Sequence, residues 1–266
     1  LCAGQSNMVM PLNGFDYCPI SDSNNVIADA PNHPGIRMVT IKPTVKLSPQ
    51  EYAEGSWQQP TTENAPKFSA AAYHYALTLQ RTLQIPIGVI TCAWGGSRVE
   101  GWLPKEILQT YKDEDLTLIG SDKTPVYLQS MLMYNGILYP CHKYTIKGFI
   151  WYQGESNVRS SRTYAERLAT MVKHWRSIWK QGDLPFYYVE TVPFACEYKE
   201  DGYIGALLRE AQQKALSLIP NSGMIGTNDL VETYEAPQVH PHNKKGIGER
   251  LAYMSLNKTY GYQGIE

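Results

Sequence analysis

The chain has 266 residues, of which 43% are hydrophobic and 18% charged, and its formal net charge is −1. This length and composition are typical of one globular domain with a sizeable core. The charge balance argues against nucleic acid or an anionic membrane surface as a partner, and no apolar run is long enough to predict a membrane span.

Five cysteines, with no C-x-x-C spacing, do not predict a zinc site or a redox motif. No cluster of metal-ligating residues is evident, so neither a metal nor a cofactor is expected. The odd number leaves at least one free thiol and keeps every disulfide pairing open. The cysteines are Cys2, Cys18, Cys92, Cys141 and Cys196. The 19 tyrosines and six tryptophans either pack in the core and surface or line a carbohydrate-binding cleft.

Predicted strands and helices alternate along the chain. Short apolar runs predict strands over Leu1–Ala3, Ile36–Ile41, Ile85–Trp94, Ile146–Tyr152, Pro185–Val192 and Gly223–Thr227. Apolar residues at helical spacing predict helices over Phe68–Leu83, Tyr164–Trp179, Ile204–Leu218 and Asn243–Leu256. This order predicts an α/β fold with a parallel sheet covered on both faces.

Ligands of such sheets bind at the carboxyl ends of the strands, so the corners that follow strands are the places to search. Two long polar segments, Met10–Gly35 and Lys42–Ala65, are expected to be loops that shape a cleft at these corners.

The first corner carries Ser6, which follows Gly4 and Gln5 at the expected start of a helix. Free backbone N–H groups surround such a position, and they can stabilise an oxyanion. An ordinary N-cap serine would fit the same place. The second corner, Trp94-Gly95-Gly96, lets the backbone approach a ligand, although a simple tight turn also fits.

The third corner, Trp151–Asn157, places Gln, Glu, Ser and Asn side chains together at a strand end. The fourth carries His240, whose neighbour Pro241 favours the first position of a helix. His242 is the weaker candidate because it falls within the first helical turn. A polar loop and a helix-capping histidine remain the alternatives at these two corners. Together, the four corners supply a serine, a histidine and oxyanion donors, which are the components of acyl transfer.

These blocks resemble the sialate O-acetylesterase family, which belongs to the SGNH-type hydrolases and is close to a group of acetylxylan esterases. The resemblance rests on Gly4–Met8, Trp94–Gly96, Trp151–Asn157, and His240-Pro241 with Asn243-Lys244. It spans almost the whole chain. The serine lacks the G-x-S-x-G elbow of the α/β-hydrolase fold.

The resemblance implies a three-layer α/β/α sandwich with a flavodoxin-like parallel sheet. It implies that Ser6 is the nucleophile and His240 the general base, without a metal or cofactor. The oxyanion hole would consist of the backbone N–H groups of Ser6 and Gly96 and the side chain of Gln153. The same corners would line the substrate cleft with Gln5, Asn7, Trp94, Gly95, Glu155 and Asn157.

One position departs from the family pattern. The family places an aspartate two residues before the histidine and the wider superfamily three before, but this chain has Gln238 and Pro237 there. The upstream carboxylates Asp229, Glu232 and Glu235 have the wrong spacing. We therefore expect a Ser–His dyad, with Gln238 as the candidate that orients the histidine ring through its amide oxygen.

The resemblance implies hydrolysis of O-acetyl esters on a carbohydrate, with sialic acid as the leading substrate. Acetylxylan or another acetylated polysaccharide is the alternative. Arg98, Arg159 and Arg209 are candidates, by position only, for binding a sialate carboxylate, although surface charge or a local salt bridge is the more common role of such residues. A glycan-binding module without activity would also fit the missing aspartate. A lipid or thioester hydrolase would need an apolar channel, which the polar loops do not predict.

The sequence is expected to be a single SGNH-type domain over residues 1–266, cut from a longer chain with further domains. The resemblance favours a periplasmic or secreted location, but no leader is visible in the sequence.

Overall fold

The structure is a computed structural model that describes residues 1–194, 202–235 and 237–265. Cys196 lies outside the described residues. The other four cysteines are buried free thiols, and Sγ of Cys92 lies 3.7 Å from Sγ of Cys141.

The described residues form a six-stranded sheet with the order β2-β3-β1-β4-β5-β6, and all neighbouring strands are parallel. Without β2, which is added at one edge, the order of the other five strands is that of a flavodoxin-like sheet. The strands are β1 (Cys2–Gly4), β2 (Ile36–Thr40), β3 (Ile87–Ala93), β4 (Phe149–Tyr152), β5 (Phe186–Val189) and β6 (Ser222–Ile225). Each of them overlaps a predicted strand.

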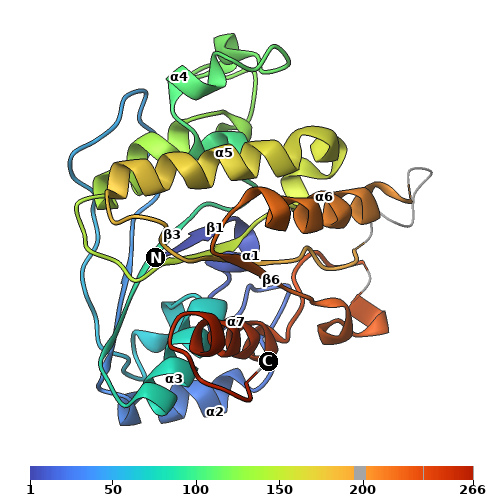
Figure 1. The fold of residues 1–266 in the computed structure, drawn as a ribbon. Helices are drawn as coiled ribbons and strands as arrows, with labels where there is room; N and C mark the ends of the chain where they lie inside the picture. The colour runs from blue at the N-terminus through green and yellow to red at the C-terminus, as the bar shows by residue number, and fades with distance from the viewer. Residues whose placement is uncertain (195–201, 236, 266) are drawn as a thin grey trace.

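Helices cover both faces of the sheet, which confirms the predicted three-layer α/β/α fold (Figure 1). Helices α5 (Ser161–Trp179) and α6 (Ile204–Leu218) lie on one face, and α3 (Ala70–Leu83) and α7 (Lys244–Lys258) on the other. Each face has its own apolar core. Trp102, Trp151 and Trp175 are in contact under α5, and Tyr73, Ile247 and Leu251 are buried under α3 and α7.

Local signals in the sequence determine where the long helices begin and end. Helix α3 begins after Ser69, whose hydroxyl accepts a hydrogen bond from the N–H of Ala72, and α7 begins after Asn243, whose side chain accepts from Gly246. Helices α3 and α5 end at Gln84 and Lys180, which both adopt the left-handed conformation. Such caps satisfy backbone groups that the helix itself leaves without partners.

The segment Met10–Gly35 differs from the prediction, because it is not a continuous loop. It contains α2 (Ser23–Asp29) and a 3₁₀ turn over Ala30–Asn32. Asn24 and Asn25, which have low helix propensity, made this helix hard to predict from the sequence. The side chains of Val26 and Ile27 pack against the core and stabilise it. The segment 42–65 contains no helix or strand until the turn at Ala65, in agreement with its prediction as a loop.

Short helical turns make up most of the connections, including the long one between β3 and β4. The short α-helices are α1 (Ser6–Val9) and α4 (Lys105–Leu108). The 3₁₀ turns besides Ala30–Asn32 are Ala65–Lys67, Val99–Trp102, Leu116–Leu118, Val126–Leu128, Tyr139–Cys141, η8 (Glu155–Ser160), Asn228–Leu230 and Thr233–Glu235, and Tyr134–Leu138 is a π-helical turn. Among the described helices, none has the length and apolar character needed to cross a bilayer.

Gly4 allows the backbones of β1 and β4 to approach each other at the first corner. Its φ is +143°, and a β-carbon there would lie 2.0 Å from the carbonyl oxygen of Tyr152. That same oxygen accepts the N–H of Gln5 at 3.0 Å, and the carbonyl of Gly4 accepts the N–H of Trp94 at 2.9 Å. The corner therefore requires a residue without a side chain.

We expect Gly4→Ala to lower the free energy of unfolding by about 3 kcal/mol or more, because the new methyl group meets backbone that cannot yield. Gly182→Ala is the control, since Gly182 also has a positive φ of +75° but no atom within 4 Å of the position of a β-carbon. Its loss should be about 1 kcal/mol. Denaturant unfolding measures both, and equal losses would contradict the steric argument.

Candidate active site

Ser6 and His240 are in contact although 234 positions separate them along the chain. Ser6 is the first residue of α1, directly after β1, and His240 lies in the loop before α7. The Oγ atom of Ser6 is 2.8 Å from Nε2 of His240. Strands β1 and β4 form the switch point of the flavodoxin-like order, where ligands of such sheets bind.

His240 is buried in an environment of low polarity that includes two aromatic rings. The ring of Phe15 packs edge-on against it at 5.2 Å between centroids, and the exposed ring of Tyr17 lies 6.1 Å away. Burial, followed by the positive charge of Lys244, lowers the pKa of His240 to about 4. The imidazole is therefore neutral near pH 7 and able to accept a proton.

The second corner brings Gly95 and Gly96 next to Ser6. A β-carbon on Gly95 would lie 3.8 Å from Cβ of Ser6, and the ring of Tyr127 covers Gly96. Trp94, which precedes them, is half-buried. Among the described residues, the N–H groups of Ser6 and Gly96 have no hydrogen-bond acceptor, so both are available to a ligand.

The third corner is fully buried at Gln153. Its Nε2 donates to the carbonyl of Ser97 at 3.0 Å and to Oδ1 of Asn157 at 2.8 Å, and its Oε1 accepts the hydroxyl of Tyr164 at 2.9 Å. Both hydrogens of the amide therefore have acceptors within the chain. Gln5 connects the first corner to the third. Its Oε1 accepts hydrogen bonds from the backbone N–H groups of Gly154 and Ser156, at 3.3 Å each.

Asn7, Glu155 and Lys244 form a buried chain of polar contacts behind Ser6. The side-chain amide of Asn7 donates to Oε1 of Glu155 at 2.6 Å, and Nζ of Lys244 donates to Oδ1 of Asn7 at 2.8 Å. Burial raises the pKa of Glu155 and lowers the pKa of Lys244 to about 7. Lys244 was part of the family resemblance but received no role from the sequence, because only the fold reveals that it is buried.

Gln238 does not contact His240. Its backbone N–H donates to the carbonyl of Glu235, and Nδ1 of His240 is buried without a hydrogen-bond partner in the described part of the chain. The expected orientation of the ring by Gln238 is therefore wrong for this structure. Spacing along the sequence does not determine the direction of a side chain in a loop, and Gln238 lies in the loop between the turn at residues 233–235 and α7.

The upstream carboxylates have other partners. Oε1 of Glu235 accepts the backbone N–H of His242 at 2.8 Å and also contacts Nδ1 of His242, while its Oε2 accepts the N–H of Glu232 at 2.9 Å. Asp229 pairs with Arg250 on the surface. His242 is thus a partner of Glu235 that closes the loop on which His240 lies.

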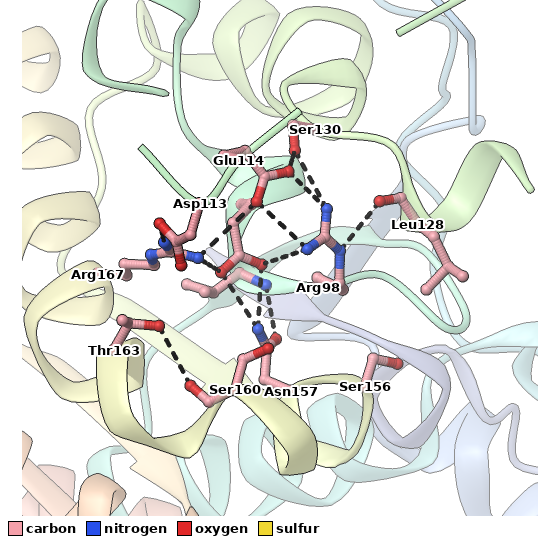
Figure 2. A network of polar contacts seen from close by, with 12 residues as sticks. Arg98, Asp113, Glu114, Leu128, Ser130, Ser156, Asn157, Ser160, Thr163 and Arg167 are labelled. Carbon is pink, nitrogen blue, oxygen red and sulfur yellow. Dashed lines mark hydrogen bonds and ion pairs between the residues drawn. The ribbon is translucent and has the colours of Figure 1, made fainter. Parts of the chain in front are cut away.

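Below the second and third corners, a network of charged groups connects the chain between β3 and β4 to α5 (Figure 2). Glu100 is completely buried, and its carboxylate accepts from Arg167 at 2.7 Å and from the amide of Asn157 at 3.0 Å. Arg98 donates to Glu114 at 2.6 Å and to the carbonyl of Leu128 at 3.0 Å.

This network engages one of the three arginines considered for a sialate carboxylate. The guanidinium of Arg98 points toward Glu114 and Ser130 within the network and donates to Glu114 (Figure 2). Arg159 is exposed on η8. Burial raises the pKa of Glu190, and the charge of Arg209 on α6 partly opposes this increase. Asn157, expected in the cleft, instead links Gln153 to Glu100 and accepts the N–H of Val99 at 2.9 Å.

A cavity of about 300 Å³ opens beside the second corner. It reaches Gly95, which borders Ser6, and its walls come from α1, the ends of β2 and β3, and the chain before α3. The lining residues are Val9, Thr40, Pro43, Lys67, Ser69, Thr91, Ala93, Trp94 and Gly95. Over the described residues, no group of three or more His, Cys, Asp or Glu side chains is arranged to hold a metal ion.

The structure is that of an α/β protein in which a serine and a histidine are in contact at the switch point of a flavodoxin-like sheet, an arrangement typical of enzymes of acyl transfer. The sequence profile of the family described as "Carbohydrate esterase, sialic acid-specific acetylesterase" matches residues 1–257. The chain belongs to this family of carboxylic ester hydrolases, which confirms the resemblance seen in the sequence.

Solved structures agree with this assignment. A crystal structure described as a novel carbohydrate acetylesterase from Xanthomonas citri superposes with a TM-score of 0.84 and 31% identity, covering 98% of this chain and 56% of that one. A protein of Arabidopsis thaliana superposes with a TM-score of 0.58 at 19% identity, covering 96% of this chain and 95% of that one, which shows the same fold.

Curated relatives carry the name sialate O-acetylesterase. The human protein is 25% identical over 289 residues, and the mouse protein is 24% identical over 314 residues. Each alignment covers 100% of this chain, but only 54% of the human and 57% of the mouse protein. The chain thus spans about half the length of these relatives.

We expect Arg167→Met to lower the free energy of unfolding by about 3 kcal/mol, because it removes the nearer of the two cations that pair with the buried carboxylate of Glu100 and leaves only Arg98 at 3.7 Å. Lys173→Met is the matched control, since Lys173 is an exposed cation on the same helix. Denaturant unfolding should show a clear loss for the first variant and almost none for the second. Similar values for the two would show that the buried pair does not stabilise the fold.

Proposed function

We propose that the chain hydrolyses O-acetyl esters on carbohydrates through Ser6 and His240, with acetylated sialic acid as the leading substrate. The observation that carries this proposal is the 2.8 Å contact between Ser6 Oγ and His240 Nε2 at the switch point of the sheet. The catalytic unit comprises residues 1–266 as a single domain, which is also part of the proposal.

The reaction proceeds through an acetyl-enzyme. Ser6 Oγ attacks the acetyl carbonyl carbon while His240 Nε2 takes the hydroxyl proton. The bond between the acetyl carbonyl carbon and the sugar oxygen then breaks, and His240 gives the proton to the departing sugar oxygen. Water attacks the acetyl-serine with His240 as the base, and this step releases acetate and restores Ser6. No metal or cofactor takes part in the proposed steps.

The oxyanion of each tetrahedral intermediate is proposed to bind the backbone N–H groups of Ser6 and Gly96. Both lack an acceptor among the described residues, which supports this role. Gln153 is the proposed third donor, sharing with the oxyanion the amide hydrogen that it now gives to Ser97 at 3.0 Å. Preorganised donors of this kind stabilise charge as it develops.

The sugar is proposed to lie between exposed aromatic rings next to the catalytic pair. Tyr17 beside His240 is 65% exposed and Tyr127 over Gly96 is 42% exposed, so each presents a ring face to solvent. Aromatic faces pack well against sugar rings. The cavity at Gly95 is the proposed place for the part of the substrate beyond the ester, with the exposed cation of Lys67 on its wall.

We expect Ser6→Ala to lower turnover of p-nitrophenyl acetate by about 10³-fold or more without unfolding the protein. A fluorophosphonate probe should label Ser6 in the unmodified protein and lose that label in the variant. Labelling of a different serine in the folded protein would contradict the assignment of the nucleophile.

We expect Gln153→Ala to lower turnover by about 10²–10³-fold if the amide donates to the oxyanion. The kinetic constants should separate this role from substrate binding, since a lost oxyanion donor lowers kcat and leaves KM nearly unchanged. A change confined to KM would identify Gln153 as a substrate ligand instead.

Acetate release from a panel of substrates tests the substrate class. The panel contains O-acetylated sialic acid, acetylated xylan and p-nitrophenyl acetate, with Ser6→Ala as the background. Release from sialic acid alone or in excess supports the proposal. Preference for xylan assigns the alternative polysaccharide substrate, which the engagement of Arg98 by Glu114 favours. Absence of release from all three assigns a glycan-binding role, which the unpartnered Nδ1 of His240 favours.

A further inference from the structure

The loop that carries His240 is held by its backbone and not through the histidine ring. Three successive carbonyl oxygens each accept a hydrogen bond from a different side chain. The carbonyl of Val239 accepts from Asn7 Nδ2 at 2.9 Å, that of His240 from Cys18 Sγ at 3.0 Å, and that of Pro241 from Lys244 Nζ at 2.8 Å.

Two of these three donors are linked to each other and to the third corner. Nζ of Lys244 also donates to Oδ1 of Asn7 at 2.8 Å, and Asn7 Nδ2 also donates to Glu155 at 2.6 Å. Lys244 and Asn7 are completely buried, and the ammonium group lies 5.6 Å from the centre of the Tyr152 ring. The chain of contacts therefore joins His240 to the residue that directly follows Ser6.

The ring itself has one polar contact. When Nε2 accepts the hydroxyl of Ser6, the ring hydrogen is on Nδ1, which is buried and has no acceptor among the described residues. A carboxylate at this position would fix the ring and stabilise the imidazolium that forms during the reaction. Besides the packing of Phe15 against the ring and the contact with Ser6, the position of the ring therefore depends on the backbone on both sides of it.

We propose that Lys244, acting with Asn7, is the positioning residue for His240, holding the carbonyl groups on either side of the histidine in place of an aspartate that would hold its ring. The inference rests on the proposed Ser–His reaction and names a role for two residues that touch neither the ester nor the reacting atoms.

This arrangement has an electrostatic consequence opposite to that of an aspartate. A carboxylate beside the ring raises the pKa of a histidine, whereas a cation lowers it. The charged and titratable groups around the pair are Glu155 on η8, Glu235 on the loop, Tyr152 at the end of β4, and Cys18 and Tyr17 on the segment after α1. Lys244 is protonated below its pKa of about 7, so its charge is present throughout the acidic range in which His240 titrates.

The unmodified protein provides the first test. The acidic limb of the kcat/KM profile should lie near pH 4, because His240 must be neutral to act as a base and its pKa is lowered to about 4. A limb at or above the ordinary histidine value would show that a carboxylate or another group supports the ring, and it would overturn the inference.

The second test removes the cation. Lys244→Met keeps the length of the side chain but removes its charge and its donors. We expect kcat on p-nitrophenyl acetate to fall about 10²-fold with KM nearly unchanged. The acidic limb should move to higher pH, because loss of a nearby positive charge favours protonated His240. Lys245→Met is the matched control, since Lys245 is the next residue and exposed, and it should behave like the unmodified protein.

Lys244→Met leaves the buried carboxylate of Glu155 without its cation and could fail to fold for that reason. A double variant provides the test in that case. Lys244→Met with Glu155→Gln removes both buried charges, and it should fold and show the same fall in kcat and the same shift of the limb. Unchanged kcat in a folded variant would overturn the inference. So would a fall in kcat with an unmoved limb, since that pattern assigns Lys244 a purely structural role.

A measurement without turnover separates this inference from the proposed function. If the unmodified protein shows no activity above Ser6→Ala, the proposed function fails. The titration of the His240 ring by nuclear magnetic resonance still tests the positioning role. We expect a low pKa in the unmodified protein and a higher one in the Lys244 variant, and equal values would overturn the inference.

Discussion

Strand β1 is only three residues long, and it pairs along both edges, with β3 on one side and β4 on the other. This double pairing determines where the proposed reacting groups lie. Because all three strands run in the same direction, the corners after them meet at one end of the sheet. Gly4 allows the backbones of β1 and β4 to approach closely, since any side chain at this position would collide with the backbone of Tyr152. The free N–H groups of Ser6 and Gly96 are a direct result of the way the chain turns there.

Two buried clusters, each containing a carboxylate and a cation, support the corners on either side of the sheet. Glu100 is stabilised by Arg167, a fixed cation with a planar group that donates to several carboxylates at once. Glu155 faces Lys244 across Asn7, and here the cation is an amine whose pKa burial lowers to about 7. The charge of this amine therefore changes near neutral pH.

The alternation of β-branched runs with helical periodicity was enough to predict the sheet, its two helical layers and the corners at which Ser6, Gly96, Gln153 and His240 lie. The helices are long and periodic and the strands are continuous apolar runs, so the local sequence gives a clear signal for both. Helix α2 was missed because its few half-buried residues, Val26 and Ile27, give too short a periodic signal. The connection between β3 and β4 was not assigned, since its turns are stabilised by distant partners such as Arg167.

The detailed contacts of the site could not be predicted, for a related reason. Spacing along the sequence suggested that Gln238 would reach the ring of His240, but Nδ1 of that ring has no hydrogen-bond partner among the described residues. The groups that do contact the loop, Asn7 and Lys244, are distant in sequence or follow it on α7. Strand β2 and the segment 42–65 after it stand apart from all of this, because the flavodoxin-like order is complete without them. They nevertheless supply Thr40 and Pro43 to the cavity beside Gly95. Insertions and deletions in this segment can therefore change one wall of the cavity while Ser6 and His240 keep their positions. The shape of the cavity can thus evolve independently of the proposed catalytic pair.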